Sequence, residues 1–270
     1  MWPGVVSIEQ PDDPRLDDYR QIKERDLVGR RGMFVAEGSV VLRALVSSVD
    51  FEPVSFLIAE HRAQAASPLF EHAGAQTPVY LASQAVMNAV AGFDIHRGIL
   101  AIGRRRGPQP DLRSRLAALP PDALAVAVFG VGNHDNVGAL FRNAAAFGAD
   151  AVLLDERCCD PLYRKALRVS VGAGLTVSWA RGGGEGALLD ALIEGGFDLL
   201  ALSPTGGDPV SAIAPTGRRT ALLVGAEGPG LSAAVLARTR TVRIPMAPGF
   251  DSLNVAAAAA VGLRRLSRLS

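Results

Sequence analysis

The sequence predicts an α/β protein, with a mostly parallel sheet in its C-terminal part and a small α/β domain before it. Three observations lead to this prediction. Short apolar runs alternate with helix-like segments through most of the 270 residues. A stretch rich in arginine and proline at 104–122 separates two parts of the chain. In the second part, glycine- and proline-rich loops directly follow apolar runs, as they do at strand ends in α/β folds.

The first part, residues 1–103, is predicted to be a polar extension followed by the small domain. A helix-like pattern covers 15–28, and 39–46 has the apolar spacing of another helix. Apolar runs bounded by turn residues predict strands at 33–38, 54–58, 79–81 and 98–102, with helices between the middle ones. After the linker at 104–122, residues 123–270 are predicted to form the second domain.

The second part alternates more cleanly. We predict strands at 124–129, 151–154, 199–202, 220–224 and 241–244. Helical patterns lie between them at 137–147, 186–194 and 232–238, and a final helix covers 254–269. Apolar strands separated by helices indicate a mostly parallel sheet that is covered on both faces.

Composition excludes several classes of protein. Hydrophobic residues make up 49% and charged residues 20%, which is typical of a globular chain rather than a disordered one. No apolar run approaches the ~20 residues of a membrane helix, and the N-terminus lacks the pattern of a signal peptide. We therefore expect a cytoplasmic protein without a membrane partner. The only cysteines, Cys158 and Cys159, are neighbours, so we expect two free thiols and no metal site.

The positive charge is carried almost entirely by arginine. The net charge is only +1, which alone argues weakly against nucleic acid. Lys23 and Lys165 are the only lysines among 28 basic residues. Arginine makes forked contacts with phosphate and stacks on bases, so this composition suits RNA. A coding bias that favours arginine explains the count equally well.

A first motif lies at 136–142, where a predicted strand gives way to a helix. Val137, Leu140 and Phe141 form an apolar stripe, and Arg142 lies about 140° away from Val137 at 100° per residue. Arg142 is therefore free to face a cleft. Asn136 stands at the start of the helix, where an amide side chain can cap it or hold a ligand. An ordinary capped helix with a solvated arginine would look the same.

A second motif, Gly225-Ala226-Glu227-Gly228-Pro229-Gly230-Leu231-Ser232, follows the predicted strand that ends at Val224. It lacks the lysine and hydroxyl residue of a P-loop, and Glu227 opposes phosphate at that place. A polar, uncharged ligand edge such as adenine fits the loop better. Ser232 is the expected N-cap of the next helix. A plain strand-to-helix turn is the alternative.

A third motif, 244–255, follows the last predicted strand. Ile244 and Met246 offer apolar contacts there, while neighbouring prolines and a glycine prevent a regular helix. Asp251 or Ser252 is expected to cap the final helix, with Asn254 in its first turn. Such a helix start directs backbone N–H groups toward a cleft. Three such motifs at strand ends of one sheet predict a ligand site.

Together, the three segments resemble the motifs of the SpoU (TrmH-type) RNA 2′-O-ribose methyltransferases in the SPOUT superfamily. The matching residues are Asn136, Gly138 and Arg142 in the first motif, 225–232 in the second, and 244–246 with 252–255 in the third. Residues 34–38 and 97–101 resemble the edges of an L30e-like substrate-binding domain. The family pattern usually has a serine where this chain has Ala256, so one hydroxyl near the site is missing.

The resemblance implies an α/β trefoil knot, S-adenosyl-L-methionine as the cofactor, and a homodimer formed through the knot region. By position, it implies cofactor contacts from Val224, Gly225, Ile244, Met246 and Leu253. The implied catalytic residue is Arg142, supported by Asn136, Glu227, Ser252 and Asn254. The implied reaction is methylation of a ribose 2′-hydroxyl, with ribosomal RNA favoured and tRNA as the alternative.

Two other interpretations remain. The chain could be a catalytically silent RNA-binding protein of the same fold, although retained Arg142, Glu227 and Asn254 argue against that. It could also be a nucleotide-binding enzyme of another class, such as a dehydrogenase, which the glycine spacing disfavours. His134 is a candidate general base because histidine titrates near neutrality, but a loop residue at a helix start is the simpler interpretation. Arg157, Tyr163, Arg164, Lys165 and Arg168 form a basic segment that the resemblance places near the RNA.

Overall fold

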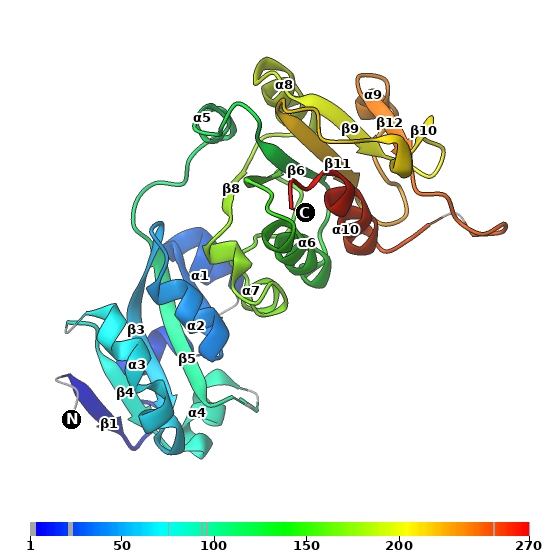
Figure 1. The fold of residues 1–270 in the computed structure, drawn as a ribbon. Coiled ribbons are helices and arrows are strands. Elements are labelled where there is room, and N and C mark those ends of the chain that lie inside the picture. The colour runs from blue at the N-terminus through cyan, green and yellow to red at the C-terminus, as the bar shows by residue number, and fades with distance from the viewer. Residues whose placement is uncertain are drawn as a thin grey trace. The chain divides into compact units, whose positions relative to one another are not determined.

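The computed structural model of the chain describes residues 4–20, 24–74, 76–92, 94–95, 97–250 and 252–269, and divides into two compact units (Figure 1). The first unit comprises Met1–Pro108 together with Leu162–Thr176. The second comprises Gln109–Pro161 and Val177–Ser270. A short piece from the middle of the chain therefore belongs to the N-terminal unit, which no pattern in the sequence indicated.

The first unit is built on a mixed five-stranded sheet with the order β1-β4-β3-β5-β2 (Figure 1). Its strands are β1 (Val5–Ile8), β2 (Met33–Glu37), β3 (Phe51–Ala59), β4 (Val79–Ala82) and β5 (Ile99–Arg105). The central strand β3 pairs parallel with β4 and antiparallel with β5. The helical elements are η1 (Pro14–Tyr19), α1 (Glu24–Arg31), α2 (Ser39–Val46), η2 (Glu60–Arg62), α3 (Ala63–Ala73), α4 (Gln84–Ala91), α7 (Arg164–Val169) and η3 (Ala173–Leu175).

Two features of this unit differ from the sequence prediction. The N-terminal stretch contains the edge strand β1, whose four residues pair with β4 alone. A short edge strand carries only a weak pattern of alternating apolar residues, so the sequence did not predict it. The helix expected over 15–28 is instead the 3₁₀-helix η1 and the separate helix α1, and residues 21–23 lie outside the described part. Leu16 of η1 and Leu27 of α1 are both buried in one apolar cluster, which explains the helical spacing.

The segment 162–176 packs within the first unit through specific contacts. Arg164 Nη1 lies 2.7 Å from Glu37 Oε2, and Glu37 is only 5% exposed. The hydroxyl of Ser48 donates a hydrogen bond to the carbonyl of Leu175 at 2.7 Å. Gly172 has φ +86°, and a Cβ there would lie 2.7 Å from the Ala44 Cβ atom, so only glycine permits this close approach. A buried carboxylate requires such a cationic partner.

The second unit is built on a seven-stranded sheet in which every pair of neighbours is parallel. Its order is β10-β12-β9-β11-β6-β7-β8. The strands are β6 (Leu124–Phe129), β7 (Ala151–Leu154), β8 (Ser178–Arg181), β9 (Asp198–Leu202), β10 (Asp208–Pro209), β11 (Thr220–Gly225) and β12 (Arg240–Arg243). The predicted α/β fold class with a mostly parallel sheet is confirmed, while the edge strands β8 and β10 were not predicted. The trefoil knot stays a prediction from the resemblance.

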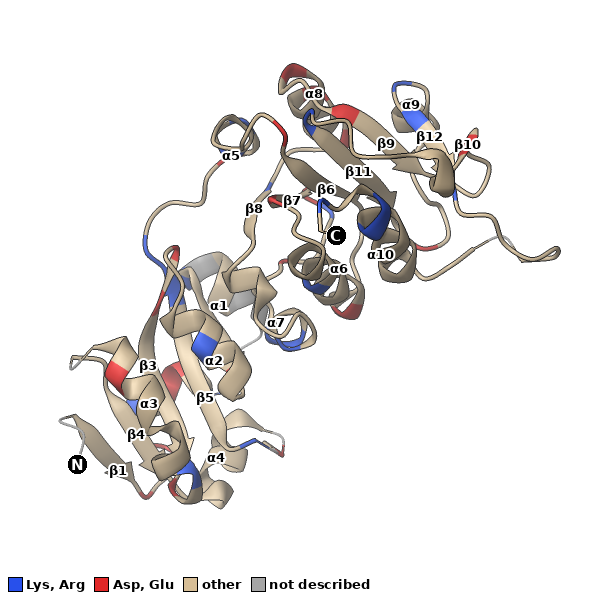
Figure 2. Ribbon diagram, in the orientation of Figure 1, with Lys and Arg blue, Asp and Glu red and all other residues tan. Residues whose placement is uncertain are grey.

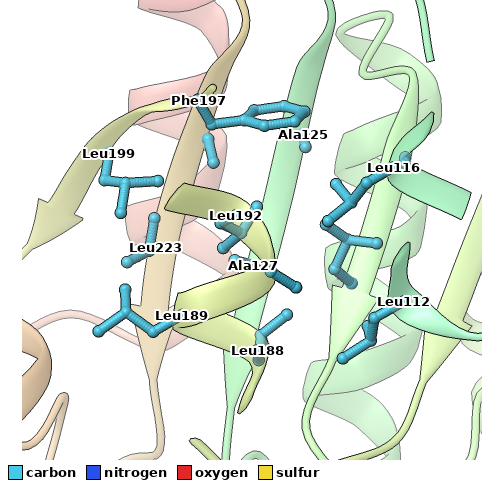
Figure 3. Packing of buried hydrophobic residues seen from close by; sticks show 14 of the residues in the cluster. Leu112, Leu116, Ala125, Ala127, Leu188, Leu189, Leu192, Phe197, Leu199 and Leu223 are labelled. Carbon is cyan, nitrogen blue, oxygen red and sulfur yellow. The ribbon is translucent and has the colours of Figure 1, made fainter. Parts of the chain in front are cut away.

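Helices cover both faces of this sheet. On one face, α5 (Leu112–Ala117) and α8 (Glu185–Glu194) pack against alternate residues of the central strands, including Ala125, Ala127 and Leu223 (Figure 3). On the other, α6 (His134–Ala146) and α10 (Val255–Leu266) lie together, and Gly262 of α10 meets the side chain of Leu222. The remaining helical elements are η4 (Val210–Ala212) and α9 (Ala233–Leu236).

Residues 104–122, which were predicted to be a linker, contain regular secondary structure. They include the end of β5 and the whole of α5, which Asp111 caps by accepting a hydrogen bond from the Ser114 N–H at 2.7 Å. Figure 2 shows basic and acidic positions interleaved through both units, in keeping with the net charge of +1. Within the described residues, no helix is both long and apolar enough to span a bilayer.

Candidate active site at the carboxyl ends of the parallel strands

The carboxyl ends of β9, β11 and β12 lie along one edge of the sheet because all three strands are parallel. The loops that follow them, together with the start of α10, enclose a pocket of about 340 Å³. This is where parallel α/β sheets bind ligands. The volume falls within the range of roughly 300–1,000 Å³ that is typical of small-molecule sites.

The loop after β11 closes tightly on itself. The N–H of Gly230 donates to the carbonyl of Ala226 at 2.9 Å, which folds the loop back toward the strand end. A Cβ atom on Gly225 would lie 2.3 Å from the carbonyl carbon of Gly230, so a side chain cannot fit there. The loop ends at Ser232, whose hydroxyl accepts from the Val235 N–H and caps α9 as predicted. The closed loop leaves backbone groups of 225–231 lining the pocket.

Asn254 connects the three loops that the sequence singled out. Its Nδ2 atom donates to Asn136 Oδ1 and to Glu227 Oε1, both at 2.8 Å. Its Oδ1 atom accepts from the N–H groups of Ala256 at 2.9 Å and Ala257 at 3.2 Å. Every hydrogen-bonding atom of one amide side chain is therefore used.

This geometry corrects the expected start of the last helix. Asn254 is the N-cap of α10 itself and does not lie in its first turn. Ser252 lies further upstream, lining the pocket, and Asp251 lies outside the described residues. A single Asn can hold both roles because its amide has an acceptor for the helix and a donor for the site.

The structure gathers most of the residues that the sequence singled out. Val224, Gly225, Ile244, Met246 and Leu253, the expected cofactor contacts, all line the pocket. The pocket is also lined by two of the expected catalytic residues, Glu227 and Ser252. Their roles stay predictions.

Of the other three expected catalytic residues, Asn254 is the N-cap of α10, and Asn136 and Arg142 come from α6. Asn136 is 7% exposed and reaches the site through its hydrogen bond with Asn254. Arg142 does not line the pocket. It lies on the exposed side of α6, with no hydrogen bond or ion pair to another described residue. Its guanidinium is thus available to a molecule that approaches from solvent.

One wall of the pocket was not predicted from the sequence. Leu202, Ser203 and Pro204, which end β9 and begin the next loop, form one wall. A Ser-Pro-Thr-Gly-Gly run after an apolar strand carries the same glycine and proline signal as the other loops. The strand order explains the omission, because β9 lies between β12 and β11 and so its end must face the same pocket.

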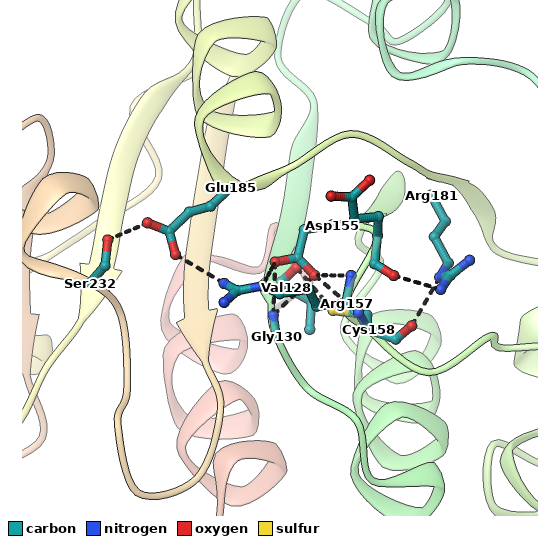
Figure 4. A network of polar contacts seen from close by, with 9 residues as sticks. Val128, Gly130, Asp155, Arg157, Cys158, Arg181, Glu185 and Ser232 are labelled. Atoms are coloured by element: carbon teal, nitrogen blue, oxygen red, sulfur yellow. Dashed lines mark hydrogen bonds and ion pairs between the residues drawn. The ribbon is translucent and has the colours of Figure 1, made fainter.

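A buried carboxylate organises the neighbouring strand ends (Figure 4). Asp155, directly after β7, is fully buried and accepts hydrogen bonds from the N–H groups of Gly130, Arg157 and Cys158 at 3.0–3.1 Å. Burial, with Asp155 beside it, raises the pKa of the Cys158 thiol to about 12. Cys158 is a buried thiol, packed rather than poised as a nucleophile.

The basic segment expected near RNA is largely engaged with acidic residues. Arg157 pairs with Asp155 at 3.4 Å and with Glu185 at 3.2 Å. Arg164 and Arg168 pair with the buried Glu37, at 2.7 Å and 3.7 Å. These arginines form ion pairs with carboxylates of the same chain. The number of basic residues in a sequence segment does not show such pairing.

The all-parallel sheet and its strand-end pocket define a ligand-binding α/β protein, and comparison with known proteins identifies the family. The model of the SpoU rRNA methylase family matches residues 123–264. The chain belongs to that family, as the three motifs predicted.

Similarity to three known proteins extends over nearly the whole chain. An uncharacterised tRNA/rRNA methyltransferase of Mycobacterium bovis is 43% identical over 98% of this chain and 92% of its own. The crystal structure of an RNA 2′-O ribose methyltransferase superposes with a TM-score of 0.77 at 26% identity, covering 97% of this chain and 98% of the other. An AdoMet-bound rRNA methyltransferase from Sinorhizobium meliloti has a TM-score of 0.81 at 22% identity, with 96% of each chain covered, and so shares the fold.

Proposed function

We propose that the protein transfers the methyl group of S-adenosyl-L-methionine to a ribose 2′-hydroxyl in ribosomal RNA. The observation that carries this proposal is the Asn254 bridge, which joins Asn136 and Glu227 at 2.8 Å beside a pocket of about 340 Å³. The bridge places a carboxylate and two amide side chains together at the edge of the pocket, where they can contact a polar substrate.

The pocket fits the cofactor in chemistry as well as size. Gly225 and the loop that closes on it line the pocket, and the backbone N–H and C=O groups of such a loop can hydrogen-bond an adenine edge. Ile244, Leu253 and Val224 offer apolar walls for a flat ring and a thioether chain. S-adenosyl-L-methionine supplies an electrophilic methyl group on a sulfonium when bound.

The chain's own residues must then orient the ribose and stabilise charge on its 2′-oxygen. Arginine is always protonated, so Arg142 does not act as a free base. Its exposed guanidinium is suited to stabilising a developing alkoxide or gripping the adjacent phosphate. Glu227 and Asn254, hydrogen-bonded to each other, hold the polar side of the site in one geometry.

The preference for ribosomal RNA rests on the first unit. A separate α/β unit of this size before the catalytic one resembles an L30e-like domain and suits a folded RNA target. We assign substrate binding to this unit and catalysis to the second, and we expect a cytoplasmic homodimer formed through the predicted knot region.

The first test supplies radiolabelled S-adenosyl-L-methionine with unmodified ribosomal RNA and, separately, unmodified tRNA. Label recovered as a 2′-O-methylated nucleotide in ribosomal RNA is the expected result. Label in tRNA alone would overturn the substrate. Binding of the cofactor without transfer to either RNA or to assembled ribosomal subunits would favour the silent RNA-binding protein.

Substitution of Arg142 tests the chemistry. Arg142→Ala is expected to lower methyl transfer by at least about 100-fold, as for loss of a transition-state donor. Affinity for S-adenosylhomocysteine should stay within about twofold of wild type, because Arg142 does not line the pocket. Arg113→Ala, which removes an exposed pair with Glu194 on the opposite face of the sheet, is the matched control. Simultaneous loss of binding and transfer in Arg142→Ala would show a structural role instead.

A further inference from the structure

A second polar connection lies at the end of the loop after β11, at Ser232 (Figure 4). Asn254 contacts this loop near its beginning, at Glu227. The end of the loop, Ser232, is held from another direction by Glu185, the first residue of α8. None of the three sequence motifs includes Glu185.

The connection begins at the fully buried Asp155. Both carboxylate oxygens of Asp155 accept from the Gly130 N–H, at 3.1 and 3.0 Å, and so fix the start of the loop between β6 and α6. Arg157 Nε lies 3.4 Å from Asp155 Oδ2. A buried carboxylate that accepts several N–H hydrogen bonds holds those donors in place, because losing any of them would leave its negative charge less compensated.

Arg157 carries the connection outward to Glu185. Its Nη2 atom lies 3.2 Å from Glu185 Oε2, and the other carboxylate oxygen of Glu185 accepts from the hydroxyl of Ser232. Glu185 thus uses one oxygen for each neighbour. The Ser232 hydroxyl simultaneously accepts from the Val235 N–H at 3.3 Å, so its position is fixed from both sides.

We propose that Glu185 is a positioning residue that holds the loop 225–231 in the geometry that binds the cofactor; the proposal rests on the function proposed above. Through Arg157 and Asp155, Glu185 couples the end of that loop to Gly130, where the loop leading to Asn136 and α6 begins. The two connections, at Asn254 and at Glu185, hold the loop at its two ends. Loss of either one leaves part of the pocket wall free to move.

Glu185→Ala tests the proposal directly. Removing the carboxylate takes away the acceptor of the Ser232 hydroxyl. It also leaves Arg157 with one carboxylate partner, Asp155, in place of two. The dissociation constant of S-adenosylhomocysteine, measured by calorimetry, should rise about tenfold, which corresponds to roughly one hydrogen bond. In the ligand-free protein, amide exchange at 226–231 should accelerate while that of β6 is unchanged. In turnover assays, KM for the cofactor should rise and kcat should stay within about threefold.

Two conservative variants separate positioning from folding. Ser232→Thr keeps the hydroxyl and should retain wild-type affinity. Glu185→Gln keeps an acceptor for Ser232 but not the charge opposite Arg157, and should show an intermediate effect. Glu194→Ala, at the other end of α8, removes an exposed pair with Arg113 and should change nothing.

Unchanged affinity and unchanged exchange at 226–231 in Glu185→Ala would overturn the proposal. Equal acceleration of exchange in β6 would also overturn it, since Glu185 would then act on the whole fold. Failure of the wild-type protein to bind S-adenosylhomocysteine would instead contradict the proposed function, and exchange in the ligand-free protein would still decide whether Glu185 positions the loop.

Discussion

Asn254 shows how one side chain can combine structural and site roles. Its acceptor caps α10, and its donor reaches two side chains that are far apart in sequence, Asn136 in the first turn of α6 and Glu227 in the loop after β11. The resemblance pointed to these three residues together. Their mutual contact could not be predicted from any local pattern, because it depends on the loops after β6 and β11 meeting the start of α10.

Asn254→Asp separates these two roles. The variant keeps the cap but loses the Nδ2 donor, leaves the buried Asn136 Oδ1 without that partner, and places a carboxylate opposite Glu227. We expect the free energy of unfolding in urea at pH 7 to fall by about 1–3 kcal/mol.

Salt dependence identifies the cause of that loss. Part of the deficit in Asn254→Asp should disappear in high salt, because like-charge repulsion is screened. Asn254→Ser caps the helix without adding charge and should show no such recovery. A charged variant as stable as wild type at low salt would contradict the assigned geometry.

The loop after β11 depends on the absence of one side chain. Strand β11 runs to Gly225, and the chain returns so closely that the carbonyl carbon of Gly230 would lie 2.3 Å from an added Cβ. Glycine spacing in the sequence identified a loop at this strand end. The reason for glycine at position 225 in particular is the close approach of backbone from five residues later.

Gly225→Ala should therefore open the loop. Since the obstructing atoms are backbone, they cannot rotate away, and we expect a loss of about 1–3 kcal/mol in the free energy of unfolding. Affinity for S-adenosylhomocysteine should fall at least about tenfold, because the same loop lines the pocket. Gly29→Ala in α1, where nothing lies within 4 Å, is the matched control and should be neutral or slightly stabilising. Equal effects of the two substitutions would contradict this account of the loop.

Over the whole chain, contacts rather than sequence order define the two units. The segment 162–176 lies between β7 and β8 in sequence, yet Glu37 and Ser48 hold it in the first unit. The sequence places a basic segment there but does not show what its charges meet. The chain therefore passes from one unit to the other three times and not once.

The resemblance implies a homodimer formed through the knot region, and the loop before α10 offers exposed apolar side chains for such a contact. Phe250 is 76% exposed and Leu253 is 47% exposed, so both offer apolar side chains to a partner. We predict a mass in solution of twice the 28.2 kDa of the chain, measured by light scattering. Phe250→Asp should weaken association at least about tenfold, because burying a charge at an apolar contact is costly.

Val49→Asp provides the comparison for that substitution. Val49 is 87% exposed and belongs to the first unit, so charge there should leave the mass unchanged. A wild-type protein that stays at the mass of one chain at working concentration would contradict the dimer.

Local chemistry was sufficient to predict the alternating strands and helices and the mostly parallel sheet, and the resemblance of three motifs indicated the family. Apolar periodicity, glycine and proline at strand ends, and three short motifs all depend on residues close together in sequence. Edge strand β10, the wall formed by Ser203 and the chain from Asp155 to Ser232 depend on which strands become neighbours. Those contacts join residues tens of positions apart, and they exist only once the sheet order β12-β9-β11-β6-β7 has brought the strand ends together.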